Sequence, residues 1–219
     1  ILTHSFKGDK DYDQFIKNFS FTLAENGYTA YRFDCFGSGE SEGDFIDATV
    51  TSEIEDLEDI IKYVREQNHE AICLVGLSLG GIVSILAYDN SIKCLILWGP
   101  PLDLSILYKR YKSQFADREY LEQTQKYSGK KIIVGRKMWE EFNEYQVPDK
   151  LPEITSPVLV IYGENDELTD VYKKGEIFNK FNTDKKELMV IKNGDHDFLI
   201  PEAQKEASDL SINWIKKYL

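Results

Sequence analysis

The feature that most constrains the fold is a run of 18 uncharged residues, 71–88, with glycines at its centre. A run of this length approaches that of a membrane span. Its centre reads Gly76-Leu77-Ser78-Leu79-Gly80-Gly81, and the apolar pattern changes there from that of a strand to that of a helix. The run therefore predicts a buried strand, a tight turn and a helix, and no membrane span is needed.

Strand-like and helical patterns alternate along most of the chain, which is typical of βαβ units and a parallel sheet. The length of 219 residues fits one α/β domain with an insertion. We expect a mostly parallel central sheet flanked by helices. The expected strands are 1–4, 29–35, 71–77, 93–98, 157–162 and 187–191, and the expected helices outside the central run are 11–26, 51–67, 171–181 and 201–219.

The alternation fails once, in the stretch that follows residue 100. Fifty-odd residues without a clear pattern are too many for a loop in a compact domain. We therefore divide the chain into an α/β core, 1–100 and 151–219, and a cap, 101–150, made of short helices and a hairpin over the carboxyl edge of the sheet. Its aromatic residues could line an acyl pocket, although at helical spacing they more often pack in a core. Its basic clusters, 109–112 and 130–137, are expected to be solvated faces.

Charge and cysteine content exclude several classes of function. Lys and Arg number 26 against 38 Asp and Glu, a net charge of −12 that disfavours binding to nucleic acid or anionic membranes. Three cysteines in strand-like runs predict buried thiols and a reducing, cytoplasmic compartment. No metal-ligand spacing and no phosphate-binding glycine loop occurs, so we expect no metal and no cofactor. The chain opens in mid-strand at Ile1, so upstream residues are expected in the natural protein, and a homodimer is neither required nor excluded.

Ser78 is the candidate nucleophile. It stands in a Gly-x-Ser-x-Gly motif between a predicted strand and a predicted helix. Such a turn lifts the serine Oγ above the sheet, and side chains two residues away on either side would collide there. The helix N-terminus also favours developing negative charge. The alternative is a glycine-rich packing turn with an incidental serine.

His196 is the candidate base among three histidines. His69 precedes the strand that leads to Ser78 and so lies at its opposite end. His4 follows the opening strand. His196 directly follows the last strand, at the edge where ligands of α/β sheets collect. We predict that it acts as general base and then as general acid, the alternative being an incidental surface histidine.

Asp166 is the candidate carboxylate that orients the histidine. It stands three residues after Gly163, which closes the predicted strand 157–162. The carboxyl ends of parallel strands meet at one edge of a sheet, so this placement brings it toward the other two candidates. Three neighbouring acids compete for the role, the last of them expected to cap the next helix: Glu164, Glu167 and Asp170.

The order of the three candidates, serine, aspartate and then histidine, resembles that of α/β-hydrolases. The resemblance covers nearly the whole chain outside the cap, which it places after the sixth strand of the family fold. Residues 32–41 resemble the family's Asp-x-x-Gly-x-Gly-x-Ser loop, which implies structural roles for Asp34 and Ser41. This loop and the size of the cap are similar to the cinnamoyl/feruloyl esterase branch, and more distantly to monoacylglycerol lipases and serine aminopeptidases.

The opening residues Leu2-Thr3-His4-Ser5-Phe6 match a strand end that family members usually write His-Gly-Phe. This match implies that the backbone N–H groups of Phe6 and Leu79 form the oxyanion hole. Ser5 replaces the usual glycine, which could narrow the loop or add a hydroxyl. The family's two opening strands are absent before Ile1, which fits the expectation of missing upstream residues.

Together these observations predict a serine esterase acting on a small to medium or aryl-acyl ester. Ser78 attacks the carbonyl, His196 takes its proton, Asp166 holds the imidazole, and water then releases the acyl-enzyme. The same residues could instead hydrolyse an amide or peptide, or transfer the acyl group to another acceptor. A non-catalytic ligand-binding protein of this fold is the alternative from another class.

Overall fold

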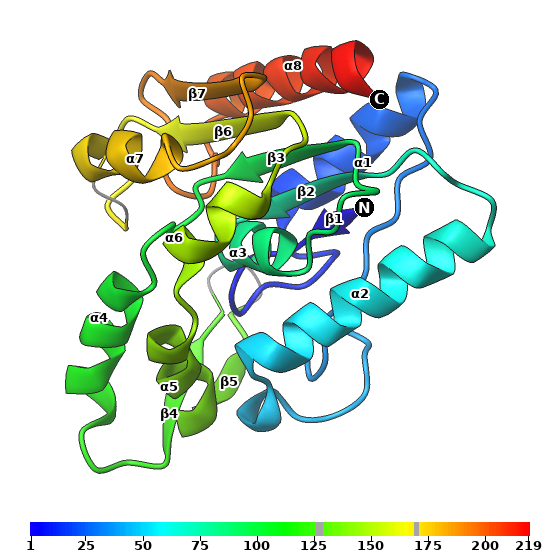
Figure 1. Ribbon diagram of the computed structural model, residues 1–219. Helices are drawn as coiled ribbons and strands as arrows, with labels where there is room; N and C mark the ends of the chain where they lie inside the picture. Colours follow the sequence, from blue (N-terminus) through cyan, green and yellow to red (C-terminus); the bar gives the residue numbers. More distant parts are fainter. Residues whose placement is uncertain (126–128, 169–170) are drawn as a thin grey trace.

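The computed structural model describes residues 1–125, 129–168 and 171–219. Its centre is a five-stranded parallel sheet in the order β1-β2-β3-β6-β7 (Figure 1). This arrangement confirms the α/β fold with a parallel sheet that the alternating patterns predicted. The strands are β1 (Leu2–Thr3), β2 (Cys73–Leu77), β3 (Cys94–Trp98), β6 (Val158–Gly163) and β7 (Lys186–Ile191).

Helices cover both faces of the sheet, which is why its strands are continuous apolar runs (Figure 1). Successive strand residues face opposite layers: Leu74 packs with α2 and α3, whereas Val75 packs with α1 and α8. The predicted helices are present with slightly shorter bounds. They are α1 (Gln14–Glu25), α2 (Val50–Glu66), α3 (Leu79–Leu86), α7 (Val171–Phe178) and α8 (Pro201–Tyr218).

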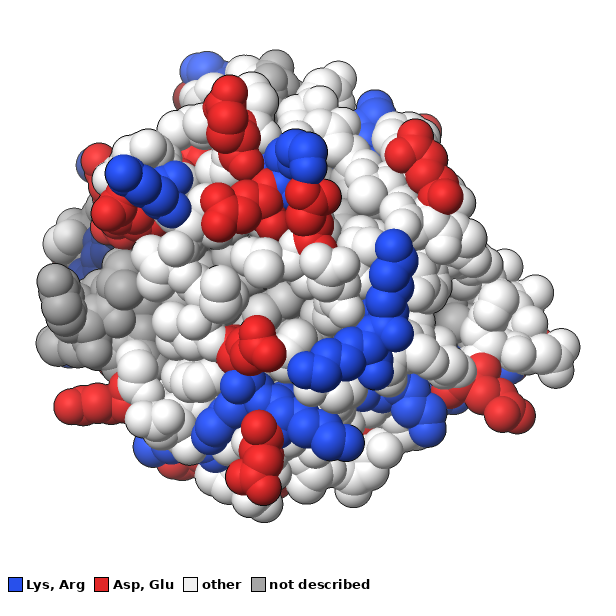
Figure 2. Space-filling view, turned by 90° about the horizontal axis from the view of Figure 1, so that it is seen from above, with Lys and Arg blue, Asp and Glu red and all other residues white. Residues whose placement is uncertain are grey.

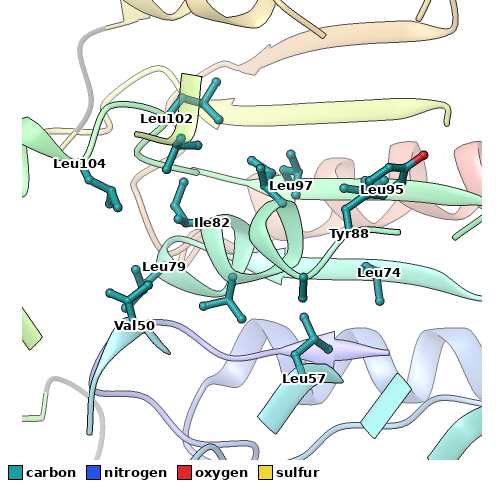
Figure 3. Close-up of a cluster of buried hydrophobic side chains, with 14 of the residues drawn as sticks. Val50, Leu57, Leu74, Leu79, Ile82, Tyr88, Leu95, Leu97, Leu102 and Leu104 are labelled. Atoms are coloured by element: carbon teal, nitrogen blue, oxygen red, sulfur yellow. The ribbon is translucent and has the colours of Figure 1, made fainter. Parts of the chain in front are cut away.

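Helix α3, which follows the candidate nucleophile, is buried along almost its whole length. Ile82 belongs to the same continuous apolar cluster as Leu57 of α2 and Leu97 of β3 (Figure 3). Burying one such side chain contributes about 2 kcal/mol. The helix is therefore held firmly against the sheet, and so is the turn that leads into it.

The 101–150 segment contains short helices and an antiparallel hairpin, as its sequence predicted. The elements lie together beside the carboxyl ends of the strands, at the lower left of Figure 1. Phe115, Trp139 and Phe142 are buried in the same apolar cluster as α2 and α3, so most of its aromatic residues serve packing. The elements are α4 (Ser105–Phe115), β4 (Tyr120–Thr124), β5 (Lys131–Gly135), α5 (Arg136–Glu144) and α6 (Val147–Lys150), followed by the 3₁₀ turn Leu151–Glu153.

The strand predicted at 29–35 is wrong for most of its length. Only one bridge forms there, between Arg32 and Leu2 of β1. Two amides at the end of this segment donate to side chains instead: the N–H of Cys35 to His4 Nε2 at 3.0 Å, and the N–H of the next residue, Phe36, to an Asp56 carboxylate oxygen at 2.7 Å. The alternating pattern is real, but side chains distant in sequence replace a neighbouring strand as acceptors.

The surface carries separate groups of acidic and basic side chains on the face shown in Figure 2. The net charge of −12 is therefore not spread evenly. The three cysteines are buried and unpaired, as expected: Cys35, Cys73 and Cys94. Among the helices of the described residues, none combines the length and apolar character needed to cross a membrane.

Candidate active site

Ser78 occupies a sharp turn between β2 and α3, with φ 55° and ψ −117°. A non-glycine residue in such a conformation costs about 1–3 kcal/mol and commonly marks a functional site. A Cβ on Gly76 would lie 2.3 Å from the carbonyl oxygen of Gly80, and a Cβ on Gly80 would lie 2.5 Å from that of His4. The two glycines of the motif are therefore required by close backbone approach.

The three candidate residues meet at the carboxyl edge of the sheet and form a continuous hydrogen-bonded chain. Ser78 Oγ lies 2.9 Å from His196 Nε2, and His196 Nδ1 lies 3.0 Å from an Asp166 carboxylate oxygen. An ionised carboxylate only accepts, so Nδ1 carries the proton and Nε2 is left to accept the serine hydroxyl proton. This is the tautomer that general-base chemistry requires.

The loops after β6 and β7 hold the acid and the base by close backbone contact. A Cβ on Gly163 would lie 2.3 Å from the carbonyl oxygen of Gly194, and the N–H of Asn165 donates to that same oxygen at 2.8 Å. Gly99, with φ 56°, leaves the space that the imidazole of His196 fills: a Cβ there would approach Nδ1 to 3.2 Å. Neighbouring loops thus fix both side chains relative to the sheet.

Burial separates Asp166 from its competitors. Its side chain has 0% exposure, and one carboxylate oxygen accepts the N–H of Leu168 at 2.9 Å while the other accepts from the histidine. Glu164 and Glu167 are exposed. Asp170 lies outside the described residues. Among the described carboxylates, Asp166 is the one that the fold brings to His196.

Phe6, in the loop after β1, lines the same cavity as Ser78 and Leu79. The N–H of Ser5 donates to an Asp13 carboxylate oxygen at 3.1 Å, and His4 Nδ1–H donates to the Ser5 carbonyl oxygen at 2.9 Å. Within the part of the chain that the structure describes, neither the N–H of Phe6 nor that of Leu79 has an acceptor in the protein. Both amides are therefore available to a ligand oxygen.

A cavity of about 540 Å³ opens above Ser78 and His196. Residues from the core form its floor, and Leu107 and Tyr111 of α4 form one wall. A volume of this size suits a small-molecule ligand. Helix α4 of the 101–150 segment is therefore part of the site.

Sequence reasoning missed three residues near the cavity. Asp13 is buried, caps α1 and supports the loop at Ser5, and burial raises its pKa. An aspartate directly before a helical stripe is a capping signal that could have found it. Lys7 and Arg110 both line the cavity, and no sequence signal indicated this. Arg110 is exposed, as the expectation of a solvated face for the 109–112 cluster requires, and it lines the cavity as well.

Contacts in the 34–41 loop agree with the structural roles that the resemblance implied. Asp34 accepts from Lys10 Nζ at 2.6 Å and from the N–H of Glu40 at 3.0 Å, and these bonds help to lower its pKa although burial opposes them. Ser41 Oγ donates to the Asp34 carbonyl oxygen at 2.6 Å. The loop is thus closed by its own polar groups. In the described stretches, no group of three His, Cys, Asp or Glu side chains has an arrangement that could hold a metal ion.

Residues 4–129 match the family model described as serine aminopeptidase, S33, which covers more than half of the chain. The chain therefore belongs to this family of α/β-hydrolases, and it is a serine hydrolase. A carboxylesterase of Bacillus subtilis (strain 168) is 23% identical over 205 residues, which cover 86% of this chain and 80% of the relative.

Solved structures share the fold over almost the whole chain. Est1E from Butyrivibrio proteoclasticus with bound ferulic acid has a TM-score of 0.80 at 20% identity, covering 98% of this chain and 88% of that one. A monoacylglycerol lipase of Paleococcus ferrophilus has a TM-score of 0.75 at 18% identity, covering 97% and 91%. These likenesses confirm the α/β-hydrolase fold that the sequence motifs suggested.

Proposed function

We propose that the chain hydrolyses carboxylic esters with Ser78, His196 and Asp166 as its catalytic triad. The observation that carries the proposal is the hydrogen-bonded chain from Ser78 Oγ through the imidazole to the buried carboxylate, with contacts of 2.9 and 3.0 Å. The φ of 55° at Ser78 supports it, because such a conformation is costly without a role.

The reaction runs through an acyl-enzyme. Ser78 Oγ attacks the ester carbonyl carbon while His196 Nε2 takes its proton, and the imidazolium is stabilised by the carboxylate of Asp166. The oxyanion accepts from the N–H groups of Phe6 and Leu79, and His196 then gives its proton to the leaving alcohol. Water, deprotonated by the same imidazole, attacks the acyl-enzyme and releases the acid.

Residues 101–150 form the cap of the site in this proposal, and 1–100 with 151–219 form the catalytic core. Leu107 and Tyr111 would contact the acyl or alcohol group of a small to medium or aryl-acyl ester. The volume of about 540 Å³ supports this substrate size, as do the carboxylesterase and ferulic-acid-bound relatives. Three buried, unpaired cysteines support a cytoplasmic location.

The test joins covalent labelling with a substrate panel. A fluorophosphonate is expected to label Ser78 once per chain, located by peptide mass spectrometry, and to abolish hydrolysis of 4-nitrophenyl esters. Peptide amides in the same panel separate esterase from aminopeptidase activity. Labelling at another residue with Ser78 unmodified would overturn the assignment. Faster turnover of amides than of matched esters would retain the triad and replace the substrate class.

A further inference from the structure

Two basic side chains from different segments line the proposed active-site cavity. Lys7 belongs to the loop after β1, next to Phe6, and Arg110 belongs to α4. Within the described residues, neither has a carboxylate within 4.0 Å, and Lys7 Nζ donates to the uncharged amide oxygen of Gln123 at 2.7 Å. The pKa of Lys7 is lowered by burial and, next, by the positive charge of Arg110. The cavity thus holds two like charges that disfavour each other.

Basic side chains that follow the same loop are paired, whereas Lys109 and Lys112 on the outer surface of α4 have no carboxylate partner among the described residues and do not line the cavity. Lys10 lies 2.6 Å from an Asp34 carboxylate oxygen, and Arg32 lies 2.7 Å from one of Asp11. In a chain with a net charge of −12, acidic partners are plentiful. Two cations left without a carboxylate beside a nucleophile therefore point to a partner that the protein itself does not provide.

The backbone holds Lys7 in place for such a role. Its φ is 64°, a conformation that non-glycine residues seldom adopt outside turns and functional sites. Gln125 Nε2 donates to the Lys7 carbonyl oxygen at 2.9 Å, and this bond connects the loop after β1 to the hairpin formed by β4 and β5. The ammonium lies 5.5 Å from the centre of the Phe6 ring, and Phe6 also lines the cavity.

Acidic side chains line the cavity as well. Glu167, Asp195 and Asp197 belong to the loops after β6 and β7. Asp195 accepts the N–H of Leu199 at 2.7 Å, and Asp197 contributes only the smallest of the three named influences on the pKa of Lys7. An anionic group in the cavity is attracted to Lys7 and Arg110 and repelled by these carboxylates, so charge would orient a charged substrate.

We infer that the ester cleaved at this site carries an acidic group, a carboxylate, that Lys7 and Arg110 bind while Ser78 attacks the ester carbonyl. The inference rests on the proposed function and names its substrate class. Arg110 can donate two parallel N–H bonds to a carboxylate, and Lys7 can donate a third. A carboxylate bound between the two cations attracts both of them, offsets their mutual repulsion and favours the charged form of Lys7.

Two pairs of esters test the inference, one for each side of the ester bond. On the acyl side, mono-4-nitrophenyl adipate is compared with methyl 4-nitrophenyl adipate. On the alcohol side, 4-acetoxybenzoate is compared with methyl 4-acetoxybenzoate. We expect kcat/KM in one pair to be about tenfold higher for the anionic ester, since charge-assisted hydrogen bonds are strong, and the preference to weaken as salt is added.

Arg110→Gln is expected to reduce the anionic-to-neutral ratio of kcat/KM about tenfold, and Lys7→Gln to reduce it by a similar factor. The matched control is Lys109→Gln, an exposed residue on the same helix that does not line the cavity and should leave the ratio unchanged. A neutral preference in both pairs, or a ratio that Arg110→Gln leaves unchanged, overturns the inference.

Binding without turnover separates this inference from the proposed function. Monomethyl adipate and dimethyl adipate are titrated into Ser78→Ala by calorimetry, with and without Arg110→Gln. If no ester is hydrolysed but the monoanion binds more tightly through Arg110, the proposed function fails and the anion site stands. If neutral esters are hydrolysed through Ser78 and charge makes no difference to hydrolysis or binding, the anion site alone fails.

Discussion

The carboxyl edge of the sheet and the layer formed by α2 with the 101–150 segment are built by different interactions. At the edge, backbone atoms approach so closely that Gly76, Gly80 and Gly163 leave no space for a side chain. In the layer, aromatic rings make the contacts: Phe115 lies 5.5 Å from Trp139, and Tyr111 lies 6.2 Å from Phe142, centre to centre. Close backbone contacts at the edge position the proposed catalytic side chains at hydrogen-bonding distance, whereas the aromatic side chains of the layer mainly provide packing.

The difference extends to the buried acids of the two regions. Asp166 at the edge accepts from Leu168 and His196. Glu53 on α2 is buried with no hydrogen-bond partner for its carboxyl group among the described residues. A buried carboxyl without donors favours its neutral form, and one with donors favours its charged form. The donors at the edge therefore favour a charged carboxylate at Asp166, whereas the described residues of the layer offer Glu53 no donor that would favour its charged form.

Neutralising the acid of the edge has the largest expected effect. Asp166→Asn should lower kcat about 10⁴-fold, the loss found when a triad aspartate is replaced and the histidine takes the wrong tautomer. Steady-state hydrolysis of a 4-nitrophenyl ester measures it. KM should change little, because the carboxylate is buried away from the cavity surface.

Glu164→Gln is the matched control, since this acid precedes Asp166 on the same loop, is exposed and does not line the cavity. It should change kcat by less than about twofold, because surface charges contribute little. A large loss of kcat in Glu164→Gln with a small loss in Asp166→Asn would show that the assignment is wrong and that Glu164 is the acid that orients His196.

The edge could be predicted from the sequence because each of its parts is local. Ser78, Asp166 and His196 each follow a short apolar run, and parallel strands bring such positions together. Gly76 and Gly80 are visible as a motif. Lys7 was not predicted as part of the site, because its position depends on how the loop after β1 meets Gln123, which is far away in the chain.

The buried acid of the layer should make stability depend on pH. Burial, and then the nearby Asp56, raise the pKa of Glu53 from 4.5 to about 8. Between these values the folded protein holds a proton that the unfolded chain releases, so the free energy of unfolding falls as pH rises, by about 1.4 kcal/mol per unit. Below pH 4.5 both states hold the proton and this dependence ends.

Glu53→Gln removes this titration. The free energy of unfolding of each protein is measured in urea at pH 5 to 8. The difference between the variant and the unsubstituted protein should change by about 4 kcal/mol over this range, in favour of the variant at high pH. Glu58→Gln, an exposed acid on the same helix, is the control and should show no such trend. Parallel curves for Glu53→Gln and the unsubstituted protein would mean that the carboxyl of Glu53 is charged and stabilised in the fold.

A single methyl group at the edge should be costly as well. In Gly80→Ala the new Cβ lies 2.5 Å from the carbonyl oxygens of Thr3 and His4, and backbone atoms cannot move aside without displacing β1. We expect a loss of about 3 kcal/mol in the free energy of unfolding. Urea denaturation followed by circular dichroism measures this.

Gly175→Ala is the control with the opposite expected sign. Nothing lies within 4 Å of a Cβ at this position, which is inside α7. A helical glycine costs about 0.5–1 kcal/mol relative to alanine, so the variant should be slightly more stable. Equal losses in both variants would show that close approach is not what selects glycine at Gly80.

The layer was less predictable than the edge, for a physical reason. Its helices and hairpin were expected from the length of the stretch, but not their partners, because aromatic side chains such as Phe115 and Phe142 fit many packings. The strand expected at 29–35 failed for a similar reason: His4 and Asp56, distant in sequence, supply the acceptors that its amides use. The periodicity of hydrophobic residues predicts which side chains are buried, but it does not identify the element that packs against them.

The smallest expected effect concerns the few polar contacts between the two parts of the layer. Tyr145 OH lies 2.8 Å from Thr51 Oγ1 at the start of α2, and Glu141 accepts the N–H of Thr51 at 2.8 Å. Tyr145→Phe removes one of these contacts and should lower the free energy of unfolding by about 1 kcal/mol, the net contribution of a partly buried hydrogen bond. Tyr12→Phe, at an exposed tyrosine, should cost nothing measurable.

Activity sharpens this last comparison. The contact lies in the layer, far in the chain from Ser78 and not among the residues that line the cavity. If the contact between α5 and α2 serves packing alone, Tyr145→Phe should lose its small stability increment and keep both kcat and KM for a 4-nitrophenyl ester. A change in KM for large esters alone would show that the packing of α5 on α2 also sets the position of α4, because α4 packs against α5 and forms the cavity wall through Leu107 and Tyr111. The contact between α5 and α2 would then take part in positioning the substrate, in addition to stabilising the fold.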